Sequence, residues 1–164
     1  MNYSLTIKII LILLFIYLLI IFYVYTKQRS LLYVPQIDNY DDEQLIISTE
    51  QVFIENSSNI KLRSIFYKHP SNTKTTLLMF HGNAGPIENR FYKINKLSKY
   101  DQNILLISWR SYSGNDGVPT EEGLYDDARS AIKWLEEKDI SKKDIIIYGA
   151  VSYTHLTLPT ILLV

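Results

Sequence analysis

The five residues His81-Gly82-Asn83-Ala84-Gly85 have the types and spacing that most clearly favour chemistry in this chain. They follow an apolar run, and the two glycines let the backbone turn tightly and leave amide groups exposed near a helix start. Exposed amides at such a position are suited to holding negative charge. An ordinary tight turn between a strand and a helix would use the same residues, so the motif alone leaves both interpretations open.

The other reactive side chains predict no second site. The chain has no cysteine, which excludes disulfides, thiolate metal ligands and a cysteine nucleophile. Its three histidines, His69, His81 and His155, are too scattered to indicate a metal site, and we expect neither a metal nor a cofactor. Ser152 and His155 lie close in sequence, but a catalytic triad needs a third group, brought near by the fold, to orient the histidine. We assign this pair no catalytic role.

The charge balance argues against nucleic acid as a partner. The 164 residues include 17 basic and 17 acidic side chains, so the formal net charge is zero, and Lys and Arg form no long run. The length is enough for one domain.

The amino-terminal region predicts a membrane anchor. From Ile9 to Tyr25 the chain has no charge, glycine or proline, and Lys8 and Lys27 bracket this run. A helix over the run and its flanks just spans a hydrocarbon core of roughly 30 Å. A signal peptide would have a shorter apolar region and a small-x-small cleavage site, and a helix at a protein surface would have a polar face. We expect an uncleaved single-pass anchor in the lipid bilayer. Its orientation stays open, because Lys8 on one side is matched by Lys27 and Arg29 on the other.

The rest of the chain predicts an α/β fold. Two runs rich in β-branched and aromatic residues, Leu45–Ile54 and Ile60–Tyr67, flank a polar turn and predict an antiparallel hairpin. Apolar runs then alternate with amphipathic stretches, which predicts buried strands joined by helices in a parallel sheet. We expect these strands at Thr75–Phe80, Asn103–Trp109 and Asp144–Tyr148, and these helices at Ile87–Tyr100 and from Thr120 onward. Ligands bind such sheets at the carboxyl ends of the strands.

The second predicted helix has a clear start. Thr120 is a suitable cap, and Glu121 and Glu122 suit the positive end of the helix dipole. Asp126 and Asp127 follow on the outer side of the sheet, where we expect them to be solvated or helix-start charges.

Four stretches in order resemble the α/β-hydrolases, specifically the Bem46-like branch of serine hydrolases. They are Arg29–Pro35, Phe80–Gly85, Trp109–Gly114 and Gly117–Ala128. The resemblance implies hydrolysis of esters, thioesters or amides, with a small acyl substrate. It implies that the backbone amide of Asn83 is an oxyanion-hole donor, within the turn formed with His81, Gly82, Ala84 and Gly85, and that His81 is structural. Ser111 departs from the family pattern, which usually has glycine there, so we assign Tyr112 no role.

The chain departs from this family where the nucleophile should stand. The family has G-x-S-x-G after the third buried strand, with the acid and the base later in the chain. Here the sequence is Gly149-Ala150-Val151-Ser152-Tyr153, with the serine one position late and no glycine after it. Val151–Thr160 resembles a translated transposase adapter of the kind used in sequencing libraries, and the same reading frame accounts for residues through Val164.

We therefore expect a membrane anchor at residues 1–28, a partial α/β-hydrolase domain at 29–149 and a non-native tail at 150–164. The catalytic Ser, Asp and His would lie beyond Gly149 in the intact protein, so the chain as it stands would be inactive. Its last strand would lack covering elements and leave an open, apolar edge. The alternative is a non-catalytic, membrane-tethered binding module on a hydrolase scaffold.

Overall fold

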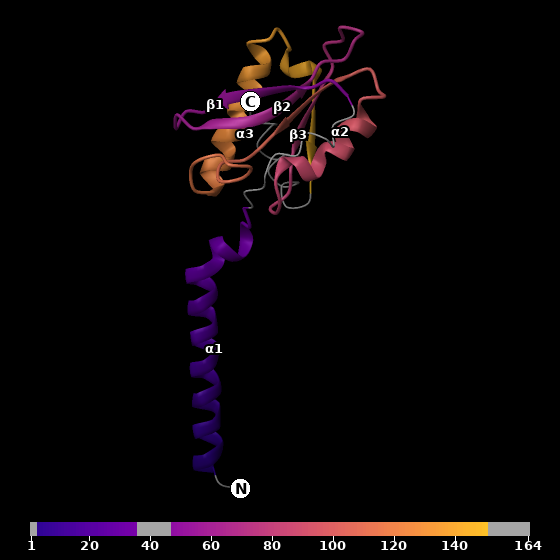
Figure 1. Ribbon diagram of the computed structural model, residues 1–164. Coiled ribbons are helices and arrows are strands. Elements are labelled where there is room, and N and C mark those ends of the chain that lie inside the picture. Colours follow the sequence, from indigo (N-terminus) through magenta and orange to yellow (C-terminus); the bar gives the residue numbers. More distant parts are fainter. Residues whose placement is uncertain (1–2, 36–46, 151–164) are drawn as a thin grey trace. The chain divides into compact units, whose positions relative to one another are not determined.

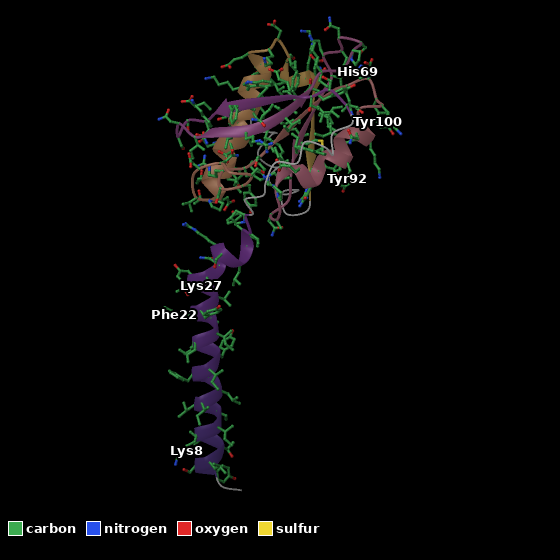
Figure 2. The ribbon with its side chains drawn as sticks, in the orientation of Figure 1. Lys8, Phe22, Lys27, His69, Tyr92 and Tyr100 are labelled. Atoms are coloured by element: carbon green, nitrogen blue, oxygen red, sulfur yellow. The ribbon has the colours of Figure 1, made fainter. Side chains whose placement is uncertain are left out.

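The computed structural model describes residues 3–35 and 47–150, in two compact units that divide between Tyr33 and Val34 (Figure 1). The first unit is the helix α1 (Tyr3–Leu32), which contains the whole apolar run predicted as the anchor and has no buried residue. Figure 2 shows Lys8 and Lys27 near the two ends of that run. In the described part of the chain, α1 is the one helix that is long and apolar enough to cross a membrane.

The second unit is built on a mixed five-stranded sheet in the order β1-β2-β4-β3-β5. Its strands are β1 (Glu50–Glu55), β2 (Lys61–Tyr67), β3 (Thr76–Phe80), β4 (Asn103–Ile107) and β5 (Ile145–Gly149). β1 and β2 form the predicted antiparallel hairpin, and β2 also pairs antiparallel with β4. β3 lies between β4 and β5 and is parallel to both. The predicted fold class is confirmed.

Two helices connect the parallel strands. α3 (Glu121–Glu136) begins as predicted, because the Thr120 hydroxyl accepts a hydrogen bond from the Gly123 N–H at 3.1 Å. The helix predicted over 87–100 is shorter and less regular. It opens as a 3-10 turn, η2 (Ile87–Arg90), and continues as α2 (Phe91–Leu97). A second 3-10 turn, η3 (Lys142–Asp144), leads into β5.

Alternation along the strands sends side chains to two faces of the sheet, each covered by one helix. Ile65, Leu77, Met79, Ile104 and Leu106 pack with Ile87, Phe91 and Ile94 on the face covered by η2 and α2. The intervening residues face the other way, where the Phe66 ring meets Trp134 of α3 edge-on, with centroids 5.4 Å apart. α2 and α3 therefore lie on opposite faces. β3 and β4 are buried along their whole length.

β5 is the outer strand of the described sheet and is less covered than its neighbours. Ile146 and Tyr148 lie on the α2 face and are 50% and 36% exposed. The Lys93 ammonium group sits 5.0 Å from the centroid of the Tyr148 ring and covers part of it. Among the described residues, β5 pairs only with β3, and the expectation of an open edge stays a prediction. Ser152, His155 and the adapter-like stretch lie outside the described residues, and the three segments assigned from the sequence stay predictions.

Candidate active site

The turn at residues 81–85 lies at the carboxyl end of β3, next to the carboxyl end of β5. Phe80 is paired with Gly149 in the parallel register, and the Ala150 N–H donates to the Phe80 carbonyl at 3.1 Å. The backbone at Ala150 therefore lies beside the start of the turn. This is the edge at which parallel sheets bind ligands, and it adjoins the position where the family carries its nucleophile.

His81 is 1% exposed and uses both ring nitrogens. The Trp109 N–H donates to Nε2 at 3.2 Å, so the hydrogen is assigned to Nδ1, which donates to the Gly82 carbonyl at 2.7 Å. Burial lowers the pKa of His81 to about 3, with a smaller lowering by the Arg90 charge, and the Gly82 hydrogen bond opposes both. The ring is therefore neutral at pH 7 and has no nitrogen left for a substrate proton.

The loop after β4 packs against the same turn through aromatic side chains. The Trp109 indole N–H donates to the His81 carbonyl at 2.9 Å, and its ring stacks on Phe80 with centroids 5.0 Å apart. The Tyr112 ring meets His81 edge-on at 5.1 Å. The fully buried Trp109 and Tyr112 thus hold His81 from two sides.

Two donors converge on the carbonyl of Asn83. The Tyr112 hydroxyl donates to it at 2.9 Å, and the Val34 N–H donates to it at 3.0 Å. Val34 also forms a parallel bridge with Ala84. These bonds fix the peptide plane between Asn83 and Ala84. The hydrogen bond from Tyr112 is a contact that the sequence did not predict. The bonds of Val34 show that the Arg29–Pro35 stretch contacts the turn at residues 81–85.

Ser111 occupies a left-handed conformation, with φ of 71°. Glycine adopts this conformation without steric cost, whereas an L-residue with a side chain is strained there. This accounts for the glycine that is usual at this position in the family. The Ser111 N–H donates to the Asp116 carbonyl at 3.1 Å, so the loop closes on itself and returns Tyr112 toward the turn.

Asp127 does not lie in solvent, so the expectation of a solvated charge was wrong for it, whereas Asp126 is partly exposed. Asp127 is 0% exposed, and its carboxylate accepts bonds of 2.7 to 3.2 Å from the Arg110 guanidinium and backbone N–H. Asp126 pairs with the same guanidinium at 3.0 Å. Gly123 makes room, because a Cβ there would lie 2.6 Å from Arg110 Nη1. The physical reason is therefore a long-range partner, the Arg110 guanidinium, which packs closely against Gly123.

The charges of this cluster stabilise one another and tie it to the β1–β2 turn. Burial alone would lower the pKa of Arg110, but Asp127 and Asp126 outweigh it and raise that pKa. Burial would likewise raise the pKa of Asp126, but hydrogen bonds from Ser57 and Ser58 and from Arg110 lower it. The cluster connects the hairpin, the loop after β4 and the start of α3.

Sequence reasoning also missed a second buried ion pair. Arg63 of β2 contacts Glu88 of η2, and the Arg63 Nε donates to Gln51 Oε1 at 2.9 Å. The pair fixes the helix that follows the turn to the antiparallel part of the sheet. In residues 3–35 and 47–150, no group of three or more His, Asp and Glu side chains could hold a metal ion.

Solved structures with the same arrangement identify the fold. An esterase of Pyrococcus furiosus superposes with a TM-score of 0.60 at 19% identity, over 71% of this chain and 45% of that one. An α/β hydrolase of Vibrio vulnificus superposes with a TM-score of 0.53 at 28% identity, over 60% of this chain and 34% of that one. The second unit therefore has the α/β-hydrolase fold.

Sequence relatives indicate which branch of the α/β-hydrolases this chain resembles. Protein bem46 of Schizosaccharomyces pombe is 30% identical over 144 residues, covering 77% of this chain and 46% of that protein. The α/β hydrolase domain-containing protein WAV2 of Arabidopsis thaliana is 28% identical over 131 residues, covering 74% and 42%. The chain spans about half the length of the curated relatives it matches. No family model matches it. These relatives and structures support a Bem46-like α/β-hydrolase.

Proposed function

We propose that this chain is the part of a serine hydrolase that supplies the oxyanion-hole turn, in an enzyme that cleaves esters, thioesters or amides. The observation that carries the proposal is the position of the turn. Residues 81–85 follow β3, and the Ala150 N–H donates to the Phe80 carbonyl beside them. A nucleophile placed just after β5 would thus stand next to the turn.

The chemistry assigned to this turn is charge stabilisation. When the serine oxygen attacks the substrate carbonyl, the carbon becomes tetrahedral and its oxygen becomes an oxyanion. The Asn83 N–H would donate to that oxyanion together with the amide that follows the serine. The bonds from Tyr112 and Val34 to the Asn83 carbonyl hold the adjacent peptide in place. One such donor typically stabilises the transition state by roughly 3 kcal/mol.

The nucleophile, the acid and the base are proposed to lie beyond Gly149 in the intact gene product. Two observations support this: the chain spans about half the length of the curated relatives it matches, and residues after Gly149 lack G-x-S-x-G and resemble a translated adapter. Resequencing the gene with a library made without transposase should recover G-x-S-x-G after β5. Recovery of Val151–Thr160 unchanged would favour the non-catalytic binding module.

Membrane anchoring is proposed for α1. Its 30 residues are longer than the roughly 20 needed to span a bilayer, and its apolar window has a mean hydropathy of 3.0. The chain should stay in the membrane pellet after alkaline carbonate washing and dissolve only in detergent. Release by carbonate, or an amino terminus cleaved after α1, would contradict the anchor.

The function itself is tested by the Asn83 amide in the intact gene product. Asn83→Pro removes the N–H and should lower kcat for a nitrophenyl acyl ester by about 10²- to 10³-fold. Asn83→Ala keeps the N–H and is the matched control, which should retain most of the activity. Equal activity of the two variants would contradict the assignment, provided that both keep the parent's circular dichroism spectrum.

A further inference from the structure

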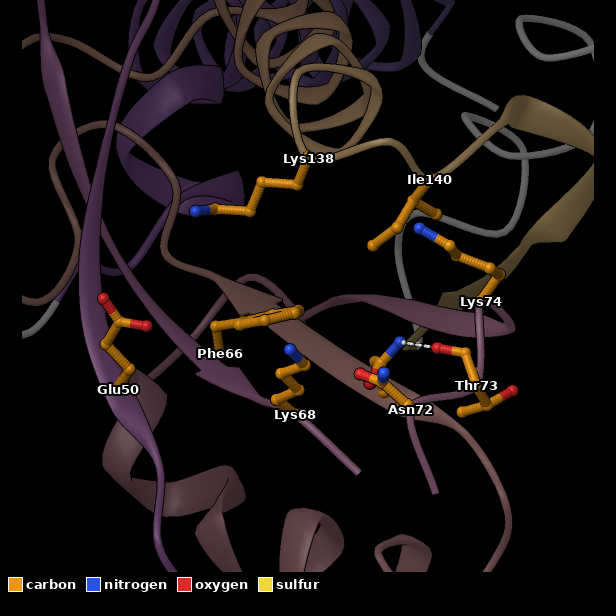
Figure 3. Close-up of a pocket in the computed structure, with 9 residues that line it drawn as sticks. Glu50, Phe66, Lys68, Asn72, Thr73, Lys74, Lys138 and Ile140 are labelled. Carbon is orange, nitrogen blue, oxygen red and sulfur yellow. Dashed lines mark hydrogen bonds between the residues drawn. The ribbon is translucent and has the colours of Figure 1, made fainter. Parts of the chain in front are cut away.

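A cavity of about 440 Å³ opens at the edge of the sheet opposite the candidate active site. It lies where β2 ends and β4 begins, and it continues to the segment after α3 (Figure 3). The five residues of β3 separate the two edges by roughly 16 Å at 3.3 Å per residue. The cavity is therefore distinct from the turn at residues 81–85. Its volume falls in the range of roughly 300 to 1,000 Å³ that is typical of small-molecule sites.

Three lysines give this cavity its charge. Lys68, Lys74 and Lys138 line it together with one carboxylate, that of Glu50. Within the described residues, none of the three ammonium groups has a carboxylate partner within ion-pair distance. The charged side chains of the lining thus carry a net charge of +2. The carboxyl end of α3 adds only about half a negative charge, which the lysines exceed.

The loop that carries Lys68 and Lys74 is held in place by a buried side chain. The Asn103 carboxamide accepts a hydrogen bond from the His69 N–H at 2.9 Å and donates to the Thr73 carbonyl at 2.9 Å. Both ends of the loop are thereby fixed to the start of β4. Lys68 and Lys74 therefore extend from a loop whose backbone is fixed by hydrogen bonds.

The rest of the lining includes the apolar side chains of Phe66 and Ile140 and the third lysine, Lys138. Phe66 and Ile140 are buried members of the lining, and Figure 3 shows Lys138, Ile140 and Lys74 on one side of the cavity with Phe66 and Lys68 on the other. The Lys138 ammonium group lies 4.6 Å from the centroid of the Trp134 ring, which itself packs against Phe66. A cation over an indole face is held in place by the attraction of the ring.

We propose that this cavity binds a small organic phosphate, a phosphate monoester that bears an apolar group. Such a monoester carries a charge of about −1.5 to −2 at pH 7, which matches the net charge of the lining. Lysine ammonium groups are common donors to phosphate oxygens. The apolar group would rest on Phe66 and Ile140. The site requires neither the nucleophile nor the residues after Ala150.

The proposal is tested by titrating phenyl phosphate into the full chain in phosphatidylcholine nanodiscs, with calorimetry as the readout. We expect saturable binding at one site. Lys68→Ala, Lys74→Ala and Lys138→Ala should each weaken it by roughly fivefold or more, because each removes a charge-assisted bond. Lys61→Ala is the matched control, since Lys61 stands exposed at the other end of β2 and outside the cavity. It should bind as the parent does.

Two results would overturn the proposal. One is the absence of saturable binding, and the other is equal weakening by Lys61→Ala, which would indicate diffuse charge attraction. Nanodiscs that contain phosphatidate distinguish the two possible sources of the phosphate monoester, a lipid headgroup and a soluble molecule. Loss of phenyl phosphate binding in those discs would support the site with a lipid headgroup as its ligand. Unchanged binding would support it with a soluble phosphate.

Discussion

The two edges of the sheet use their polar side chains in opposite ways. At the carboxyl edge, His81, Arg110 and Asp127 are buried and bonded to the protein itself. At the amino edge, Lys68, Lys74 and Lys138 are exposed and line a cavity without a carboxylate partner in the described residues. Side chains that would suit chemistry elsewhere thus hold the turn at residues 81–85 and the loop after β4 in place. The side chains left for a ligand are ordinary lysines.

The difference bears on how a histidine or an aspartate near the candidate site should be interpreted. Both ring nitrogens of His81 and both oxygens of Asp127 already have partners within the protein. Such groups stabilise a shape and do not transfer protons. The groups proposed to contact the substrate at this edge are backbone amides. The sequence indicates such amides only indirectly, through the neighbouring glycines.

Asp127→Ala should give the largest effect at the carboxyl edge. It leaves the buried Arg110 guanidinium with one carboxylate in place of two, and breaking a buried pair typically costs about 3–5 kcal/mol. The free energy of unfolding, measured by urea titration of the chain in detergent micelles, should fall by that amount. Lys68→Ala at the amino edge is the comparison, and it should change stability by less than about 0.5 kcal/mol. Similar losses in the two variants would break the contrast between the edges.

His81 should make the stability of the fold depend on pH. Burial lowers its pKa to about 3 in the folded chain from an ordinary value of 6.5, so the unfolded chain takes up a proton first as the pH falls. Its contribution is therefore complete above pH 6.5 and is lost as the pH drops toward 3. Linkage gives a loss of about 2 kcal/mol between pH 7.5 and pH 5.

Urea titrations at those two pH values measure this loss. His81→Gln should reduce the pH dependence, whereas His69→Gln, which changes a histidine at the opposite edge, should leave it in place. A parent chain equally stable at both pH values would contradict a neutral, buried His81.

Ser111→Gly should give a smaller effect of the opposite sign. The left-handed φ of 71° costs a serine about 1 kcal/mol, and glycine removes that strain while gaining flexibility in the unfolded chain. We expect a net stabilisation of about 0.5 kcal/mol, read as a higher urea midpoint. A destabilisation would show that the Ser111 side chain makes a contact that outweighs the strain.

Much of the fold followed from residue patterns. Alternating β-branched residues marked the hairpin, apolar runs marked β3 and β4, and Thr120 marked the start of α3. The length of α2 did not follow, because its stripe at Phe91, Ile94 and Leu97 ends where the chain must turn back toward β4. Periodicity reports which face is buried better than it reports where a helix stops.

The candidate site was predictable only in part. The turn at residues 81–85 was recognisable from its glycines and its neighbours. The side chains and ion pairs that hold the turn and the adjoining loop in place were not. The Arg110–Asp127 pair joins residues 17 positions apart, and a helix-start aspartate looks solvated in sequence. Gly123 was an unused signal, since a glycine inside a helix usually has a packing reason. The hydrogen bond from the Tyr112 hydroxyl to the Asn83 carbonyl depends on the left-handed conformation of Ser111. A serine in the sequence does not indicate that conformation.

The central proposal is that the turn at residues 81–85 belongs to a serine hydrolase whose nucleophile follows β5 in the intact gene product. Labelling with a fluorophosphonate probe tests it most directly, applied in parallel to this 164-residue chain and to the intact gene product. The account predicts labelling of the intact product at the serine that follows β5 and no labelling of this chain. Specific labelling of this chain at Ser152 would contradict it.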